Sequence, residues 1–328
     1  VIRLCFFSSW VGARHLDANP GASGRDLTSG SLHRDIWYLA IPMILEMGFL
    51  NVAQVLDTLW IGKLGSAALA AVIISSSIRW VINSMAAGLG SGGLAFVARR
   101  IGEHDESAAA HAAWQTIVLG LAISAAVGAL GLLVARPMLV LLGADAEVLQ
   151  LGLSYLRITM GGLFTLVLIF TINALLRGAG EARWATIVLF VATAVTVVTE
   201  WVLVFGWGPF PALGIAGSAW GSVLGFGAGL GLQVALLFSG KTRIRLSLRN
   251  FRPDLPLMRR IIRISLPNMI QMFLRSSSRL IVLGLIGLYG TFATAGYGVA
   301  NRLLLIAVIP GFGLGNAAGT LVGQNLGA

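Results

Sequence analysis

Three carboxylates interrupt apolar stretches of the sequence, where a charged group is costly unless it has a use. Glu46 and Asp57 lie in the stretch 36–61, and Glu200 lies in the stretch 184–206. Removal from water favours the protonated form of a carboxyl group, and a second carboxylate nearby favours it further. Such a pair can take up a proton near neutral pH, or hold a cation instead. The alternative is that the acids neutralise arginine partners in static ion pairs.

Asp57 and Glu200 are predicted to lie at similar depth. Asp57 stands five residues before Gly62 at the end of its stretch, and Glu200 stands six residues before Gly206. If both stretches are helices that end at the same side of a membrane, their carboxylates are level with each other. We therefore predict a shared proton or Na⁺ site at Asp57 and Glu200.

Glu46 lies eleven residues before Asp57, a separation of about 1100° at roughly 100° per residue. The two acids therefore share one face of a helix, and Gln54 lies near that face. This arrangement makes Glu46 and Gln54 candidates for a substrate cleft.

The elements that position these residues are predicted to be membrane-spanning helices. Hydrophobic residues make up 57% of the 328 residues, charged residues make up 11%, and the mean hydropathy is +0.86. A soluble domain of this length would need more charge on its surface. Each apolar segment can cross about 30 Å of hydrocarbon at roughly 1.5 Å per residue. The eight segments are 36–61, 67–100, 112–135, 148–176, 184–206, 214–239, 261–287 and 292–325.

The net charge of +10 fits a membrane protein better than a nucleic-acid-binding one, because the basic residues fall between apolar runs. With a cytoplasmic N-terminus, lysines and arginines gather in the tail and in every second loop. The opposite loops carry only Lys63 and Arg136. The positive-inside rule favours this orientation. We expect a multi-pass protein of the cell membrane, bound by lipid and not by nucleic acid.

Several local motifs are weak. GLGSGG at 88–93 fits a dinucleotide-binding pattern, but it lies inside an apolar helix with no preceding strand. His104 and His111 lie in a polar loop that is typical of a solvated face rather than a metal site. Residues 1–31 read as a disordered cytoplasmic tail without a signal peptide. No nucleophile–base pair or metal cluster appears, so we expect neither an enzyme nor a cofactor.

An internal repeat divides the chain. A shift of 225 residues places IPMILEMGFLNVAQVLDTLWIGKLG over LPNMIQMFLRSSSRLIVLGLIGLYG without a gap, and Pro42 meets Pro267. Six helices separate each position from its copy, so the copies run in the same direction, as in transporters with two parallel lobes. We predict a cytoplasmic tail (1–31), a six-helix N-terminal lobe (32–240), a basic cytoplasmic linker (241–260) and the first two helices of a C-terminal lobe (261–328).

Glycines recur every fourth residue in two segments. Small residues at this spacing form a flat stripe that lets another helix approach closely. The stripe can serve helix packing alone, or it can be a surface along which helices slide when a transporter changes between its conformational states. The glycines are Gly217, Gly221, Gly225 and Gly229 in one segment, and Gly311, Gly315, Gly319, Gly323 and Gly327 in the other.

Four motifs together resemble the multidrug and toxic compound extrusion (MATE) transporters. They are P…LDTLWIGKLG in the first segment, LRGAGEARWA at 175–185, FGWGPFPALGIAGSAWGSV at 205–223 and IPGFGLGNAAGTLVGQNLGA at 309–328. The resemblance covers the chain from Leu32 to Ala328. It implies twelve helices in two lobes and export of organic solutes driven by H⁺ or Na⁺.

The resemblance also implies roles for individual residues. Asp57 matches the first-helix aspartate of the family's cation site. The fifth-helix pattern N-x-x-x-D reads Thr196 to Glu200 here, so the carboxylate is kept and the amide is replaced by a hydroxyl. Asn173 matches a common fourth-helix asparagine. Pro42 matches a proline at which the first helix bends in some members.

The second lobe departs from the family pattern. Members with a Na⁺ site there carry a glutamate eight residues after the seventh-helix proline, where this chain has Arg275. The departure favours coupling through the N-terminal lobe. Pro42, Pro267 and Pro310 are candidate helix hinges.

We therefore predict a monomeric, cation-coupled antiporter that exports organic solutes by alternating access and has an incomplete second lobe. One alternative is a lipid-linked oligosaccharide flippase of the wider superfamily, in which Arg275, Arg279 and Arg302 line a basic cleft. In either case Arg275 and Arg279 are candidates for the substrate cleft. Another alternative is a membrane scaffold that transports nothing, in which Asp57 and Glu200 are each paired with arginine and closed to water.

Overall fold

The computed structural model describes residues 32–246, 252–287, 289 and 291–328. The predicted tail (1–31) and part of the predicted linker lie outside these ranges. Every regular element in the described residues is an α-helix, so the all-α prediction is confirmed. The helices are α2 (Leu32–Gly62), α3 (Ser66–Gly102), α4 (Glu106–Leu141), α5 (Ala146–Gly161), α6 (Leu163–Gly178), α7 (Ala182–Phe205), α8 (Ile215–Phe238), α9 (Leu255–Gly287) and α10 (Thr291–Gly327).

Four helices in the described residues are long and apolar enough to cross a membrane, namely α2, α4, α7 and α8. The pair α5 and α6 passes the same test as one span bent by 48°. This bend corrects the sequence prediction of one continuous segment over 148–176. It occurs at Gly162, where a Cβ atom would overlap the side chain of Val223 in α8. The glycine therefore lets the chain turn while α8 packs directly against it.

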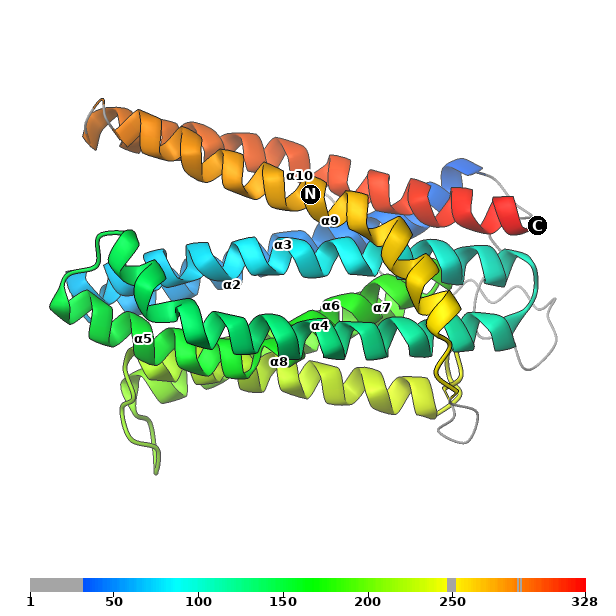
Figure 1. Ribbon diagram of the computed structural model, residues 1–328, viewed down its shortest axis with the longest axis horizontal. Helices are drawn as coiled ribbons and strands as arrows, with labels where there is room; N and C mark the ends of the chain where they lie inside the picture. The colour runs from blue at the N-terminus through cyan, green and yellow to red at the C-terminus, as the bar shows by residue number, and fades with distance from the viewer. Residues whose placement is uncertain (1–31, 247–251, 288, 290) are drawn as a thin grey trace, which may run out of the picture.

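The helices lie side by side along the long axis of the molecule (Figure 1). The turns α3–α4 and α6–α7 and the segment between α8 and α9 lie at the end that also holds the C-terminus. We call this the basic end, because Arg99, Arg100, Arg177 and Arg183 cluster there. The turns α2–α3, α4–α5 and α7–α8 lie at the opposite end, together with the end of α9 and the start of α10.

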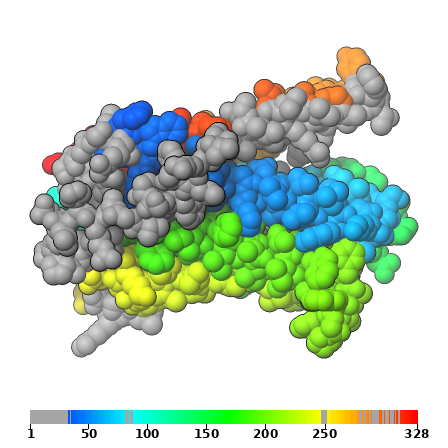
Figure 2. Space-filling view, turned by 180° about the vertical axis from the view of Figure 1, so that it is seen from behind, coloured from blue at the N-terminus to red at the C-terminus, as the bar shows by residue number. Residues whose placement is uncertain are grey.

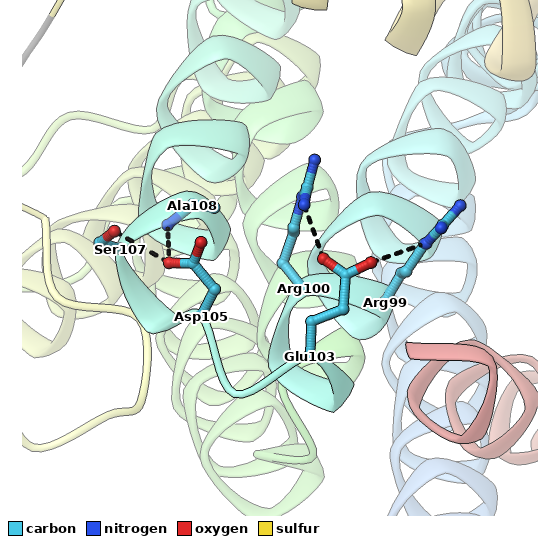
Figure 3. Close-up of polar contacts among 6 residues, drawn as sticks. All are labelled: Arg99, Arg100, Glu103, Asp105, Ser107 and Ala108. Carbon is cyan, nitrogen blue, oxygen red and sulfur yellow. Dashed lines mark hydrogen bonds and ion pairs between the residues drawn. The ribbon is translucent and has the colours of Figure 1, made fainter. Parts of the chain in front are cut away.

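The turn between α3 and α4 shows how polar groups are satisfied at the basic end (Figure 3). Glu103 accepts hydrogen bonds from Arg100 at 2.6 Å and from Arg99 at 3.0 Å, and these bonds hold its pKa below the ordinary value. Asp105 caps α4 by accepting from the backbone of Ala108 at 2.9 Å, and this bond lowers its pKa too. Within the described residues, no group of three His, Cys, Asp or Glu side chains could hold a metal ion.

Helix α9 begins at Leu255, six residues earlier than the predicted segment at 261. Asp254 caps it by accepting from the backbone N–H of Leu257 at 2.9 Å. Pro256 follows in the first turn, where a missing N–H costs nothing. The predicted linker therefore ends earlier than expected, and the arginines at 259, 260 and 263 lie on a helix.

Helices α9 and α10 form a hairpin that packs mainly on α3 and α2. Its contacts with α3 include Met269 and Ser265 beside Gly88 and Gly92, and Gln324 beside Gly102. These contacts lie in the half of the hairpin nearer the basic end. The other half diverges from the bundle in Figure 1, and the part of it that Figure 2 draws in orange stands away from the main body.

The GLGSGG run at 88–93 has a packing role in this arrangement. A Cβ atom on Gly88 or Gly92 would collide with α9, one on Gly90 would press on Ala174 of α6, and one on Gly93 would collide with Thr116 of α4. Three neighbouring helices thus contact one short length of α3.

Candidate functional site

The two carboxylates predicted to form a shared site both meet α8. The Ser218 hydroxyl donates to Oδ1 of Asp57 at 2.9 Å, and the Ser222 hydroxyl donates to Oε1 of Glu200 at 2.8 Å. Ser218 and Ser222 are four residues apart, so they lie on one face of α8. Asp57 and Glu200 are also close enough to interact electrostatically with each other. Helix α8 therefore connects the acid of α2 to the acid of α7.

The glycine stripe of α8 makes this approach possible. A Cβ atom on Gly221 would lie 2.7 Å from the backbone of Glu200, and one on Gly225 would lie 2.6 Å from the backbone of Thr196. Real Cβ atoms do not approach backbone this closely, so only glycine lets α7 and α8 pack at this distance. The stripe on α8 is thus part of the acid site as well as a packing surface.

Thr196 lies one helical turn before Glu200 and is buried. Its Oγ1 has no hydrogen-bond partner among the described residues. An unpartnered oxygen next to a buried carboxylate is a candidate cation ligand, since Na⁺ takes oxygen donors. This is the threonine that replaces the asparagine of the family pattern.

Neither Asp57 nor Glu200 forms an ion pair within 4.0 Å in the part of the chain that the structure describes. Glu200 is 3% exposed, and Asp57 is partly exposed. Arg79 of α3 is near enough to interact electrostatically with both acids, and its guanidinium lies 5.8 Å from the ring centre of Tyr155. The arrangement predicted for a static scaffold, with each acid bridged to arginine, is therefore not the one observed.

Glu46, predicted to line a substrate cleft, lies in a different environment. It is 5% exposed and forms an ion pair with Arg177 of α6. Arg177 lies in the last turn of α6. The structure therefore places Glu46 in a bridge between α2 and α6 rather than in an open cleft.

Asn173, predicted to join the cation site, lies towards the basic end. Its Oδ1 accepts from Nε2 of Gln233 at 2.9 Å. Gln233 is eleven residues beyond Ser222 on α8, or about 16 Å along the helix axis. Asn173 therefore meets the same helix, α8, as the acid pair but lies far from that pair.

The other predicted residues are distributed over the two lobes. Gln54 is exposed on α2, and Arg275 is exposed on α9. The side chains of Arg279 and Arg302 lie outside the described residues. The three predicted hinge prolines all stand inside helices, Pro42 in α2, Pro267 in α9 and Pro310 in α10.

Sequence reasoning missed the two serines as partners of the acids. The signal was present in the run GSAWGS, where each serine follows a stripe glycine, so the two serines have the same four-residue spacing and share one face of α8 with each other. Sequence reasoning also gave Arg79 no role. It did not single out Tyr155, which is fully buried.

Comparison with other proteins identifies the family. The MatE family profile matches residues 42–202 and 267–328, and the two matched ranges begin at the prolines that the internal repeat aligns. Among relatives, the probable multidrug resistance protein YoeA of Bacillus subtilis is 26% identical over 302 residues, which cover 91% of this chain and 65% of that protein. The FAD transporter of Shewanella oneidensis is 26% identical over 92% of this chain and 67% of that protein.

Solved structures agree with this relationship. A MOP superfamily transporter from Pyrococcus furiosus superposes with a TM-score of 0.86 at 25% identity, over 95% of this chain and 68% of that one. A MATE family transporter in an outward-facing conformation gives 0.84 at 25% identity, with the same coverage. The chain thus spans about two thirds of the length of these proteins, including both lobes' first helices. On the profile match over most of its residues and on this fold, the chain belongs to the MatE family.

Proposed function

We propose that this chain is the coupling part of an antiporter that exports organic solutes in exchange for H⁺ or Na⁺, with Asp57 and Glu200 as the cation site. The observation that carries the proposal is the acid pair held by Ser218 and Ser222 within an apolar bundle. A hydroxyl group orients a carboxylate and leaves its charge in place, whereas an arginine in an ion pair would neutralise that charge. The pair therefore stays available to an incoming cation.

Coupling requires that the cation bind two states with different affinity. Asp57 and Glu200 stand on α2 and α7, and α8 connects them, so their separation depends on how these helices pack. Pro42 lies inside α2 and can support a bend there. A bend that moves Asp57 away from Ser218 would change cation affinity, and cation binding would in turn favour one bend.

The packing of the α9–α10 hairpin supports alternating access. The contacts between hairpin and bundle lie towards the basic end, and the other half diverges. With the basic end in the cytoplasm, as the positive-inside rule favours, this arrangement is open to the outside. We place the protein in the cell membrane with a cytoplasmic N-terminus, as a monomer, with a small organic solute as its cargo.

The flippase alternative would place a basic cleft along the second lobe. Arg275 is the member of that predicted cleft whose side chain the structure describes, and it lies on the exposed surface of α9. The acid pair in the first lobe has no evident use in a flippase, so the coupled antiporter is the better-supported function.

The test uses the purified chain in proteoliposomes with H⁺ and Na⁺ gradients imposed separately. Wild type is expected to move an organic cation dye only when one of the gradients is present. Asp57→Asn and Glu200→Gln should each abolish this dependence while the protein inserts normally. Glu106→Gln, an exposed residue in the first turn of α4, serves as the matched control. Gradient-driven transport that survives in Asp57→Asn would contradict the proposal.

A further inference from the structure

Arg79 is a cation placed beside the acid pair. It lies in the fourth turn of α3, and its guanidinium faces the ring of Tyr155 in α5 at 5.8 Å. It interacts electrostatically with Asp57, Glu200 and the Tyr155 hydroxyl. Ser75, one turn earlier on α3, meets Gly152 of α5 closely, so the two helices pack tightly at this point.

The direction of the side chain supports this placement. Side chains of a helix lean towards its N-terminus, and the N-terminus of α3 is at the end where α2 and α7 finish. A long arginine side chain on α3 therefore reaches towards the depth of Asp57 and Glu200. Tyr155 is fully buried and forms the surface beneath the guanidinium.

The fixed charges at this site can now be counted. When both carboxylates are ionised, as a bound metal cation requires, the two acids and one guanidinium leave a net charge of one negative unit, and the serine and threonine hydroxyls add none. In surroundings of low polarity an unbalanced charge is costly, so occupation by one monovalent cation is favoured. A divalent cation would leave a positive excess.

We infer that Arg79 is a resident counter-charge that restricts the acid pair to one monovalent cation and excludes divalent ions. The inference rests on the proposed role of the pair as the cation site, and it assigns the selectivity of that site to a residue on a different helix. Arginine suits this role because it stays charged in nearly all protein environments. The Tyr155 ring face lies beneath it within the distance of a cation–π contact and supports it from the side of α5.

A purely structural role for Arg79 makes a different prediction. If the residue only packs against Tyr155, its replacement should weaken folding and create no new binding. If it is a counter-charge, its removal should create a divalent site of two carboxylates and neighbouring hydroxyls, which are ligands that Ca²⁺ accepts.

The experiment measures Ca²⁺ affinity by calorimetry on the purified chain in lipid nanodiscs at pH 8.5, where protons compete least. Arg79→Gln should bind Ca²⁺ at least about tenfold more tightly than wild type, since a full charge is removed from a poorly screened site. Arg79→Lys keeps the charge and should match wild type. Arg157→Gln, an exposed arginine on α5, is the matched control and should also match it.

A second pair of variants covers the case in which Arg79→Gln does not fold. The double variant Asp57→Asn with Arg79→Gln has the same net charge at the site as wild type. It should bind Ca²⁺ about tenfold more tightly than Asp57→Asn alone, by the same charge argument. Equal Ca²⁺ affinities within either pair would overturn the inference. Because no transport is measured, this result is separate from the test of Asp57→Asn in proteoliposomes, whose failure would reject the proposed coupling.

Discussion

The hydroxyl of Ser218 on α8 donates to the carboxylate of Asp57 on α2 at 2.9 Å, across 161 positions of the sequence. One turn further along α8, Ser222 makes the equivalent bond to Glu200 of α7. One face of α8 thus donates hydrogen bonds to two acids that lie on two other helices. Any cation that binds the pair must compete with these bonds or add to them.

Removal of either hydroxyl should slow coupled exchange. Ser218→Ala and Ser222→Ala each take away a hydrogen bond to an ionised group, worth about 1.5–3 kcal/mol. The carboxylate would then hold its proton more firmly and release it more slowly, so turnover should fall by about tenfold. Threonine at either position keeps a hydroxyl and should retain more activity than alanine. Exchange rates in proteoliposomes measure the effect.

Ser239→Ala is the matched control for the serine variants. Ser239 caps the end of α8, and its hydroxyl donates to the carbonyl of Leu236 rather than to an acid. Unchanged turnover in both site variants would show that the hydroxyls only fill space.

The glycine stripe of α8 should tolerate a methyl group at one position and not at another. In Gly221→Ala the new Cβ would lie 2.7 Å from the backbone of Glu200, which forces α7 and α8 apart and should cost about 1–3 kcal/mol. In Gly231→Ala the new Cβ meets nothing within 4 Å. That change should be neutral or stabilise the helix by up to about 1 kcal/mol. Thermal unfolding in detergent compares the two, and equal midpoints would contradict the packing described for α7 and α8.

The contributions of Glu46 and Arg177 to the stability of the fold should depend on each other. Glu46→Gln leaves a buried guanidinium without its counter-charge and should destabilise the protein by about 3–5 kcal/mol. Replacing both residues, as in Glu46→Gln with Arg177→Gln, removes both charges and should recover much of this loss. Unfolding midpoints of the two single variants and the double variant form the cycle. Strict additivity of the two single effects would mean that the side chains act independently.

The start of α9 should loosen in acid. The backbone hydrogen bond from Leu257 and the bond with His111 hold the pKa of Asp254 below its ordinary value of about 4. A depressed pKa in the folded state gives stability that is present above the unfolded pKa and lost as pH falls through the folded one. The cap should therefore persist at pH 5 and above and be lost below about pH 4. Hydrogen exchange of the amides at 255–260, corrected for intrinsic rates, measures the opening.

Asp254→Asn is the comparison for this prediction. An asparagine side chain can still cap the helix but does not titrate. The variant should show no additional opening between pH 5 and pH 3. If it opens as wild type does, another group causes the transition.

The helices of this fold could be predicted because their signals are local. Long apolar runs identify helices without knowledge of their packing. The bend at Gly162 was missed because the apolar run continues through it, and the reason for it lies on α8 at Val223. The early start of α9 was missed because its arginines resemble a linker in composition.

The site was only partly predictable for a related reason. Asp57 and Glu200 are conspicuous because acids are rare in apolar helices. Serine and threonine are not conspicuous, because in a helix they most often bond to their own backbone, as Thr199 does to Val195. Which hydroxyl turns outward to an acid depends on how α7 and α8 pack. The pairing of Glu46 with Arg177 likewise depends on where the fold places α2 relative to α6.

The glycines at 88–93 of α3 affect the speed of motion as well as packing. Helices normally interlock through side-chain ridges that fit into grooves, and relative movement must lift one set of ridges over the other. At Gly88 and Gly92, α3 presents no ridge to α9. If the α9–α10 hairpin moves along α3 during the proposed transport cycle, this contact would add little steric friction to the movement. Bulkier residues at positions 88 and 92 would raise the energy barrier to that movement. They would slow exchange between the two conformational states without stabilising either one.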